Sequence, residues 1–312
     1  MSILYGRHYE LTLYSSSDVE YLKIKAPVQI HFRVTYQLGV GSSKGTAELK
    51  IYGLNLASMD QIISKYDRVK LVAGYADNFD TIFDGHVFTP SKGKSDADQF
   101  LVLYCSMIGE PETRARINKT WGSGTRVCDI VQEVAGRLDV PVVFVPSIGS
   151  RDNDFWPSRG RVPKLSAAHP PYALLDELGK SYGFVVYRLV NKVLIIASLS
   201  TGSGSHHEIS AETGMEGSPL YSSGPTVNVV TRMNTKILPG AEMTVRSRYS
   251  VLSNDAAKTA DQAPSGLTKS GKYYASSIIH TGDLYADVWS TSIQGYAQGV
   301  QGNPITQGDN NG

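Results

Sequence analysis

The stretch Arg68-Val69-Lys70-Leu71-Val72-Ala73-Gly74-Tyr75 decides the fold class of this chain. Val69, Leu71 and Ala73 recur with a period of two, and on an extended chain such side chains point to the same side. They predict one buried face of a β-strand. Similar alternation occurs on either side of this stretch, in residues 21–24, 28–34, 47–52, 81–88 and 99–105. Six or seven strands at this spacing favour an antiparallel barrel or sandwich.

Two segments of this β region lack the period of two. Residues 56–64 predict one short helix, in which Ser58 is available as an N-cap and Ile62 and Ile63 can pack. The Gly-rich residues 39–45 superficially resemble a phosphate-binding loop, but they lack the GxxxxGK[ST] order and lead into a strand rather than a helix. We therefore interpret them as a hairpin turn.

A helical period replaces the period of two in the middle of the chain. The apolar positions that carry it are Val127, Ile130, Val131, Val134 and Leu138. They predict an amphipathic helix, for which Ser123 or Thr125 is available as the N-cap. A short strand is expected at residues 142–145, and a Pro- and Arg-rich loop at residues 150–169.

A second helix and a hairpin complete this middle segment. The helix is expected over residues 171–181, because Pro171 is tolerated in a first turn and Gly183 can end the helix. Residues 184–189 and 193–197 flank a tight turn and predict an antiparallel hairpin. The segment is interpreted as a small α+β unit.

Strand patterning returns after a Gly/Ser connector at residues 201–205. Strands are expected at residues 226–230, 243–247, 273–279 and 289–293. The polar residues 254–270 are interpreted as a long loop, and the Gly-, Gln- and Asn-rich residues 298–312 as a disordered tail. The expected units are therefore residues 1–109, 110–200 and 201–297, followed by the tail 298–312.

Composition argues against several classes of function. Lys and Arg number 30 against 29 Asp and Glu, a net charge of +1 that does not indicate a nucleic-acid binder. The apolar runs are far too short to cross a bilayer, and residues 1–7 show no secretory signal, so we expect a protein made and kept in a cytoplasm. A charged fraction of 19% together with 18 Tyr is typical of a β-rich chain with extensive partner contacts.

The cysteines are expected to be buried, reduced packing residues. Cys105 lies in an apolar strand-like run and Cys128 in a helix-like one, and neither has a His or a second Cys at ligand spacing. Neither a disulfide nor a metal pair is therefore expected. Trp121, Trp156 and Trp289 suit either a core or an interface, and the sequence leaves both open.

Two sets of residues carry a resemblance to a known family. The first set is Tyr52 and Leu54 in residues 51–54, Gly74 and Tyr75 at the end of 69–75, and Phe83 and Gly85 in 82–87. The second set is His280, Gly282 and Asp283 in residues 279–283, and Trp289 in 289–293, preceded by a Gly-x-Tyr at 271–273. Their order resembles that of the baseplate hub proteins of phage tails, including the late control protein family. Gly53 departs from the Asn that this family often has, with the spacing intact.

The resemblance implies a fold and an assembly. The implied fold class is mainly β with a small α+β insert: two tail-tube-like antiparallel β-barrel or sandwich domains flanking an α+β domain. The implied assembly is a homotrimer whose six β domains form a pseudo-sixfold ring, since a heterologous contact that closes on itself generates a ring. Such a ring would join a hexameric tail tube to a trimeric spike and leave a channel for the genome.

The resemblance also implies partners and a location. The partners would be the tail tube protein, the spike protein, the tape-measure protein, and baseplate wedge or sheath components of a contractile tail. DNA would be present only as transiting cargo, and no stable membrane association is expected. The location would be the tail baseplate of the virion, assembled in the host bacterial cytoplasm.

His280 and Asp283, with Ser277 and Thr281 nearby, are the residues that could suggest an acid–base site. No nucleophile elbow or oxyanion loop accompanies them. A Gly-Asp pair between two strands is typical of a turn, so we predict a turn that includes Gly282 and no catalytic role.

His206 and His207 could suggest a metal site. Adjacent side chains on an extended chain point to opposite sides, so one shared ion would require distortion, and a solvated loop is favoured.

A basic and aromatic segment is the remaining candidate for a binding site. Its residues are Arg151, Arg159, Arg161 and Lys164 around Phe155 and Trp156. Such interleaving suits a single strand of nucleic acid or an acidic partner. Because Asp152 and Asp154 lie in the same segment, a docking loop between subunits or a solvated loop is favoured.

The sequence predicts no catalytic residue, no metal and no cofactor. Its carboxylates occur singly, with no pair suited to glycoside cleavage. The leading hypothesis is a structural, non-enzymatic hub of a phage tail or a related injection machine. The alternatives are a tail-associated cell-wall hydrolase and a carbohydrate-binding β protein.

Overall fold

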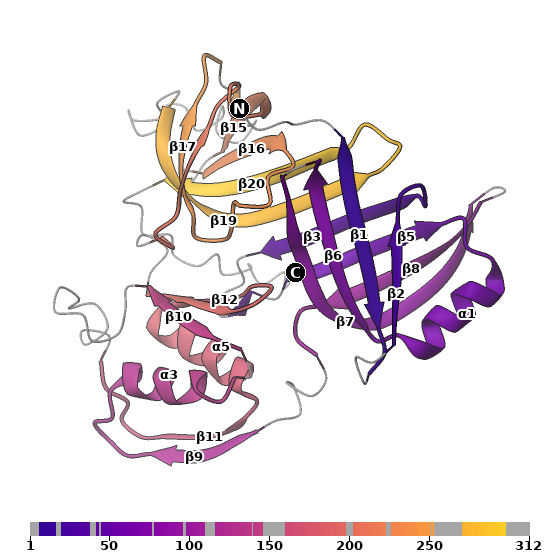
Figure 1. Ribbon diagram of the computed structural model, residues 1–312. Helices are drawn as coiled ribbons and strands as arrows, with labels where there is room; N and C mark the ends of the chain where they lie inside the picture. The colour runs from indigo at the N-terminus through magenta and orange to yellow at the C-terminus, as the bar shows by residue number, and fades with distance from the viewer. Residues whose placement is uncertain are drawn as a thin grey trace, which may run out of the picture.

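The computed structural model describes residues 6–16, 20–37, 42–43, 45–76, 78–95, 98–109, 116–138, 140–145, 160–197, 202–222, 226–249, 251–252 and 270–297. Strands dominate these residues, in one large, mostly antiparallel sheet and two small ones. Figure 1 shows two β-rich units beside each other and, below them in this view, a unit of helices and short strands. The mainly β fold with a small α+β unit, which the sequence predicts, is confirmed.

The first β unit is one antiparallel sheet that folds over on itself. Its strands are β1 (Arg7–Tyr14), β2 (Tyr21–Lys25), β3 (Ile30–Gln37), β5 (Thr46–Tyr52), β6 (Arg68–Tyr75), β7 (Asn78–Ser95) and β8 (Asp98–Ser106), in the order β3-β5-β8-β7-β6-β1-β2. The 18-residue β7 pairs with β6 along its first half and with β8 along its second. Across the interior, the Tyr36 hydroxyl on β3 donates to the carbonyl oxygen of Ile82 on β7 at 2.7 Å.

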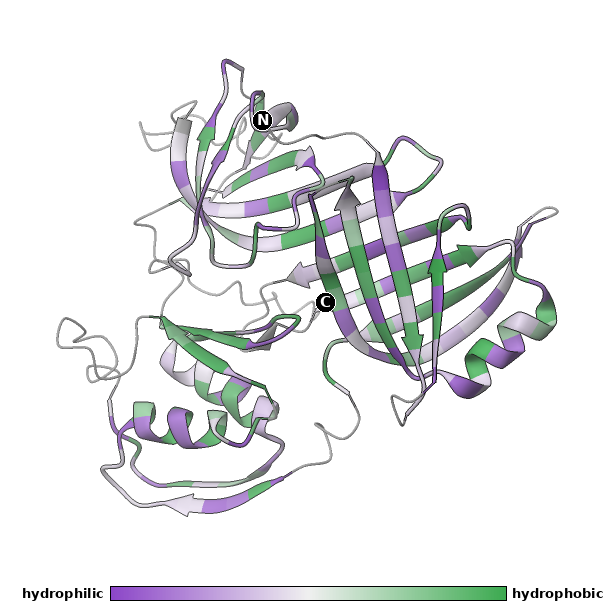
Figure 2. Ribbon diagram, in the orientation of Figure 1, coloured by the Kyte–Doolittle hydropathy of each residue, from purple (hydrophilic) through white to green (hydrophobic). Residues whose placement is uncertain are grey.

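The face of β6 that was expected to enter the core does so. Val69, Leu71 and Ala73 are each 0% exposed, which confirms the register predicted from the period of two. Figure 2 shows hydrophobic and hydrophilic residues alternating along the strands of this unit. The alternation is what burial of one face of each strand requires.

Helix α1 (Leu56–Lys65) forms where a helix was expected, but its cap differs. The side-chain oxygen of Asn55 accepts the backbone N–H of Ser58 at 2.8 Å, so Asn55 is the N-cap and the expectation for Ser58 is wrong. Asn at this position satisfies an N–H group that has no partner within the helix. Ile62 is buried against the strands and Ile63 is partly buried there.

The α+β unit contains two helices and two small sheets. Its elements are β9 (Ile117–Trp121), α3 (Val127–Ala135), β10 (Val142–Val145), β11 (Leu165–His169), α5 (Pro171–Tyr182), β12 (Val185–Arg188) and β13 (Val193–Ile196). The strand at 142–145, the helix that begins at Pro171 and the hairpin of β12 and β13 are confirmed. Gly183 ends α5 with a left-handed backbone conformation (φ 77°), which glycine adopts at little cost.

Two expectations for this unit are wrong. No side chain caps α3, because its N-cap is Arg126 and the Thr125 hydroxyl donates instead to the carbonyl oxygen of Gly122. Residues 165–169 of the expected loop are strand β11, which pairs with β9. The pairing gives backbone groups of both short strands partners, and it places Ala167 in the core under the helices.

Strands β12 and β13 are buried on both faces, because they lie between two hydrophobic cores. Tyr187 and Ile196 belong to the core of the β units, whereas Val186 and Ile195 belong to the core of the helices α3 and α5. The short strand β4 (Ser42–Ser43) extends this sheet by pairing in parallel with β12. The remaining residues of the expected hairpin turn at 39–45, apart from the buried Gly45, lie outside the described residues.

The second β unit contains more strands than the sequence indicates. They are β14 (His206–Ile209), β15 (Met215–Ser222), β16 (Thr226–Arg232), β17 (Glu242–Arg246), β18 (Val251–Leu252), β19 (Ser270–Asp283) and β20 (Trp289–Ala297). The four expected strands are confirmed as parts of β16, β17, β19 and β20, except that β17 ends at Arg246, one residue before the expected end. Strands β14, β15 and β18 were not expected. The tail 298–312, and the expected loop at 254–270 apart from Ser270, lie outside the described residues.

The Gly/Ser connector is packed where the structure describes it. Gly202 is buried, and a Cβ atom added to it would lie 2.4 Å from the Tyr274 ring. The Ser203 N–H donates to the carbonyl oxygen of Gly240 at 2.6 Å. The interpretation of these residues as a flexible connector is therefore wrong, and the glycine is explained by close packing.

One sheet runs through both β units. Strand β19 of the second unit pairs with β3 of the first, from Ser277 opposite Gln37 to Asp283 opposite His31. The path of this sheet is β18-β15-β16-β20-β19-β3-β5-β8-β7-β6-β1-β2. The two β units therefore share a core as well as backbone pairing. In the part of the chain that the structure describes, no helix is long and apolar enough to span a bilayer.

Candidate functional site

His280 is buried at the junction of the two β units. Its Nδ1 lies 2.9 Å from the hydroxyl oxygen of Thr291, which also accepts the N–H of Asn234 at 2.9 Å. The Tyr36 ring packs edge-on at 6.2 Å between centroids. Burial lowers the pKa of His280 to about 4, because the charged imidazolium would lose its hydration. This imidazole is neutral near pH 7 and is 1% exposed, which suits packing rather than proton transfer.

The predicted turn at Gly282 and Asp283 is wrong, because strand β19 continues through both residues. The turn follows at 284–288. Asp283 nevertheless bonds nearby backbone amides as expected, accepting the N–H of Tyr285 at 3.0 Å and that of Ala286 at 3.2 Å. Its carboxylate therefore shapes the turn between β19 and β20.

Gly282 is required by packing. A Cβ atom at this position would lie 2.4 Å from the Phe32 ring and 2.8 Å from the Trp289 ring. These two rings pack edge-to-face with centroids 5.3 Å apart. Because Gly282 has no side chain, the Phe32 and Trp289 rings can pack against each other directly over its Cα.

Trp289 and Gly74, from the two sets of family-like residues, meet in space. The Trp289 indole N–H donates to the carbonyl oxygen of Gly74 at 3.0 Å, and the Tyr75 hydroxyl donates to the carbonyl oxygen of Trp289 at 3.3 Å. Residues far apart in sequence thus join β6 to β20. The contact is structural, since its polar atoms are all occupied by backbone partners.

The other family-like residues are not gathered with these. Tyr52 lies on the outward face of β5, where the Lys50 ammonium sits over its ring and that of Phe100. Leu54 is partly buried, Phe83 is fully buried, and Gly85 lies against the backbone of Ser106. The candidate residues therefore form no common catalytic or binding site.

The two adjacent histidines lie in a strand rather than in a solvated loop, which corrects that expectation. In β14, His206 is exposed and lies 3.3 Å from a carboxylate oxygen of Glu242, whereas His207 is half-buried with its pKa lowered by burial. The alternation of the strand separates them, as predicted. Among the described residues, no group of three or more His, Cys, Asp or Glu could hold a metal ion.

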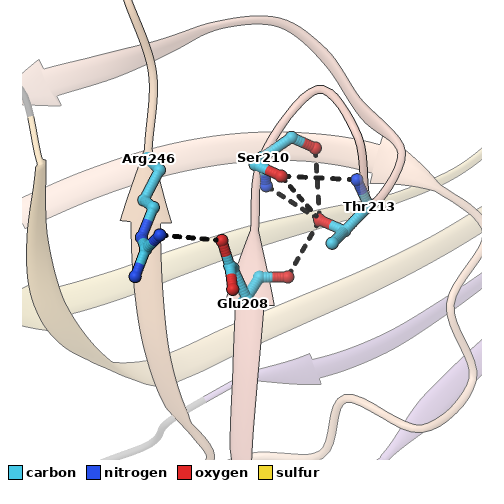
Figure 3. A network of polar contacts seen from close by, with 4 residues as sticks. All are labelled: Glu208, Ser210, Thr213 and Arg246. Atoms are coloured by element: carbon cyan, nitrogen blue, oxygen red, sulfur yellow. Dashed lines mark hydrogen bonds and ion pairs between the residues drawn. The ribbon is translucent and has the colours of Figure 1, made fainter.

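A cluster of hydroxyl and charged side chains lies at the end of β14. Figure 3 shows Thr213 at its centre: the Thr213 hydroxyl oxygen accepts the N–H of Ser210 at 2.8 Å and lies 2.9 Å from the carbonyl oxygen of Glu208. Arg246 on β17 lies 3.5 Å from the Glu208 carboxylate. The hydroxyls are used to close a turn, so the cluster is no nucleophilic site.

The basic and aromatic segment lies mostly outside the described residues. Of its residues the structure describes Arg161, which donates to the carbonyl oxygen of Gly124 at 2.6 Å, and Lys164. Cys105 and Cys128 are free and buried, as predicted, and burial raises the pKa of both thiols. Trp121 and Trp289 are core residues, 5% and 3% exposed.

The sequence did not single out the outward face of the shared sheet, which we call the open face. It consists of the outward side chains of β16, β20, β19, β3, β5 and β8. One row across it is Val230, Ser292, Ile279, Thr35, Thr46 and Ser106, and the next is Arg232, Ser290, Thr281, Arg33, Glu48 and Tyr104. These side chains are exposed or half-buried in the chain. Strands β16, β20 and β19 belong to the second β unit, and β3, β5 and β8 to the first. The pairing of β3 with β19 joins these two sets of strands into one surface.

Neither a protein-family model nor a curated protein matches the sequence. Solved structures do match the fold. The c3393 protein of E. coli, described as a component of the type VI secretion system with structural similarity to the T4 bacteriophage tail proteins gp27 and gp5, matches with a TM-score of 0.57 and 12% identity. That match covers 89% of this chain and 77% of the other.

Two tail proteins match over nearly their whole length. The tail protein from Neisseria meningitidis MC58 has a TM-score of 0.56 at 9% identity, covering 95% of this chain and 98% of its own. The 43 kDa tail protein of prophage MuSo2 from Shewanella oneidensis has a TM-score of 0.55 at 8% identity, covering 93% and 98%. This chain has the fold of phage tail proteins. At such low identity the likeness concerns the fold alone.

Proposed function

We propose that this protein is a structural, non-enzymatic hub of a phage tail or a related injection machine. Three subunits would each contribute two β units to a pseudo-sixfold ring that joins a hexameric tail tube to a trimeric spike. The observation that carries the proposal is the pairing of β3 with β19, which makes the two β units neighbours in one continuous sheet. The fold shared with tail proteins supports the same reading.

The chemistry of the open face suits a channel through the ring. Its rows combine hydroxyl side chains with opposite charges that are neighbours, as in Arg33 opposite Glu48. Strong DNA binding requires an excess of Lys and Arg that neutralises phosphates, and the chain as a whole has a net charge of only +1. A wall of this kind would let DNA pass as cargo without retaining it.

The proposed partners follow from the ring. They are two further copies of this chain, the tail tube protein, the spike protein, the tape-measure protein, and wedge or sheath components. The proposed location is the tail baseplate of a virion, with no stable membrane association. The proposed units are residues 1–109, 110–200 and 201–297, and the separate core beneath α3 and α5 supports the middle one.

Light scattering tests the ring directly. We expect a mass of about three times the 33.9 kDa subunit, either alone or when the spike is co-expressed, since stable trimer interfaces commonly bury more than about 2,000 Å². Rings with sixfold appearance are expected in electron micrographs of the same sample. Monomers under both conditions would contradict the proposal. Release of soluble fragments from purified peptidoglycan would instead support the hydrolase.

A further inference from the structure

The α+β unit carries a groove that its packing leaves unfilled. A surface pocket of about 370 Å³ lies between strand β9 and helix α3. Its lining residues are Arg116, Ile117, Asn118, Lys119 and Trp121 on the strand side, Glu133, Val134 and Arg137 on the helix side, and Pro171. Glu133 and Val134 lie in the last turn of α3, and Arg137 follows its C-cap Gly136, so the C-terminal end of α3 forms a wall of the groove.

The strand side of the groove offers backbone groups. Three consecutive residues of β9, 117–119, line the pocket together with Arg116 just before the strand, although alternate side chains of a strand point to opposite sides. The main chain of β9 therefore borders the groove. Among the described residues β9 pairs with β11 alone, so its second edge has N–H and C=O groups without strand partners. Such an edge is a template for another strand.

The groove is cationic once its internal pairs are formed. Glu133 is held by the Lys119 ammonium at 2.6 Å and by the Trp121 indole N–H at 3.0 Å, and these contacts lower the pKa of its carboxyl. Arg116 donates one N–H to the carbonyl oxygen of Ala168. Arg137 is exposed, and its positive charge also contributes to the lowered pKa of Glu133. Arg116, Lys119 and Arg137 thus stand against the single carboxylate of Glu133, which leaves an excess of positive charge at the groove.

We propose that this groove binds an extended acidic peptide segment of a partner protein, which adds as a strand to the free edge of β9. Its carboxylates would pair with Arg116 and Arg137, because guanidinium groups bind carboxylates through charge-assisted hydrogen bonds. Main-chain bonds to β9 would supply affinity, and the α3 wall would select side chains. A nucleic acid could use the charges but has no means of pairing with a strand edge. This inference does not depend on the proposed ring.

Fluorescence anisotropy with the labelled heptapeptide EVEVEVE and the purified full-length chain tests this site. We expect saturable binding, weakened about tenfold or more by Arg137→Glu or Arg116→Glu, since charge reversal turns an attraction to the peptide carboxylates into a repulsion. Lys94→Glu, an exposed position on β7 with the same change of charge, is the matched control and should change binding less than about twofold. Thermal unfolding verifies that each variant is folded.

Two further probes separate strand addition from attraction of charge alone. The same peptide with N-methyl groups on alternate residues keeps its charge but cannot complete the ladder, so we expect it to bind at least about tenfold more weakly. Equal binding of the methylated peptide, no effect of either Arg variant, or no peptide binding at millimolar concentration would overturn the proposal. Binding of oligothymidine that Arg137→Glu abolishes, without peptide binding, would assign the groove to nucleic acid.

Discussion

His280 makes the fold of this chain sensitive to pH. Its pKa is about 4 in the folded protein, against about 6.5 for an exposed histidine. The unfolded chain therefore binds a proton that the folded chain excludes between these values, and stability falls as the pH decreases from 6.5 towards 4. The full effect is about 3 kcal/mol and is absent above pH 6.5. Urea unfolding across this range measures it.

His280→Gln supplies the comparison for that experiment. The variant lacks the titrating imidazole, so its stability should decline less between pH 6.5 and pH 4 than that of the wild type, whatever its stability at pH 7. Parallel stability curves for the two proteins would mean that His280 does not exclude a proton in the fold.

Gly282→Ala tests the packing of the junction. The added methyl group would lie 2.4 Å from the Phe32 ring, so we expect a loss of about 1–3 kcal/mol through overpacking. Gly122→Ala is the matched control, because a Cβ atom there meets nothing within 4 Å and the backbone is not in the left-handed region. Chemical denaturation of both variants gives the comparison. Equal stabilities would show that the rings move aside at no cost.

The residues at this junction illustrate what the sequence can and cannot predict. The Gly-Asp pair matched the composition of a turn, and Asp283 does cap one. Gly282 is glycine for another reason: two aromatic rings, one of them on β3, cover its Cα. Local turn chemistry cannot anticipate a neighbour from the first β unit, and for this reason the sequence predicts the turn a few residues before its position in the structure.

At the scale of single elements, the cap of α1 is directly testable. Asn55→Ala removes the oxygen that accepts the Ser58 N–H, and we expect a loss of about 0.5–2 kcal/mol, as for other N-caps. Ser58→Ala should cost clearly less, since its side chain is not the cap. Thermal or urea unfolding distinguishes them. A larger loss for Ser58→Ala would restore the cap that the sequence suggested.

Strand β6 carries the core of the first β unit. Leu71 is 0% exposed, so Leu71→Ala should cost about 2–5 kcal/mol through lost burial and the cavity left behind. Lys70→Ala, one residue away on the other face, should change stability by less than about 0.5 kcal/mol. An unchanged melting temperature for Leu71→Ala would contradict the buried register of β6.

Elements with a strong hydrophobic period were predicted well from the sequence. Strands that form only because a partner strand pairs with them were not. The alternation around β6 and the helical spacing of α3 located these elements, since each buries one face, and Pro171 and Gly183 located the ends of α5. Strand β15 contains Gly217 and Pro219 and lacks that alternation, yet β16 pairs with it. The short strands β9 and β11 stabilise each other by pairing, and the sequence of neither segment alone indicates that pairing.

At the scale of the whole molecule, the pairing of β3 with β19 could not be predicted from local pattern. The sequence indicated two β regions separated by an α+β segment. The alternation in the segments that form β3 and β19 shows that each is a strand, but it does not show which strand each pairs with. The pairing joins residues more than two hundred positions apart and unites both units in one core. It also creates the open face, the surface on which the proposed function depends most.

The position of the open face within a ring can be tested by labelling. If it lines a channel, Ser292→Cys in the assembled ring should react with a small maleimide but much more slowly with a maleimide carried on a bulky dextran. Ala57→Cys, exposed on α1, serves as the comparison and should react with both reagents. The two native cysteines are buried with raised pKa values, so their background reaction should be low. Equal dextran rates for the two variants, in a preparation that light scattering shows to be trimeric, would place the open face on the outside and remove the channel from the proposed function.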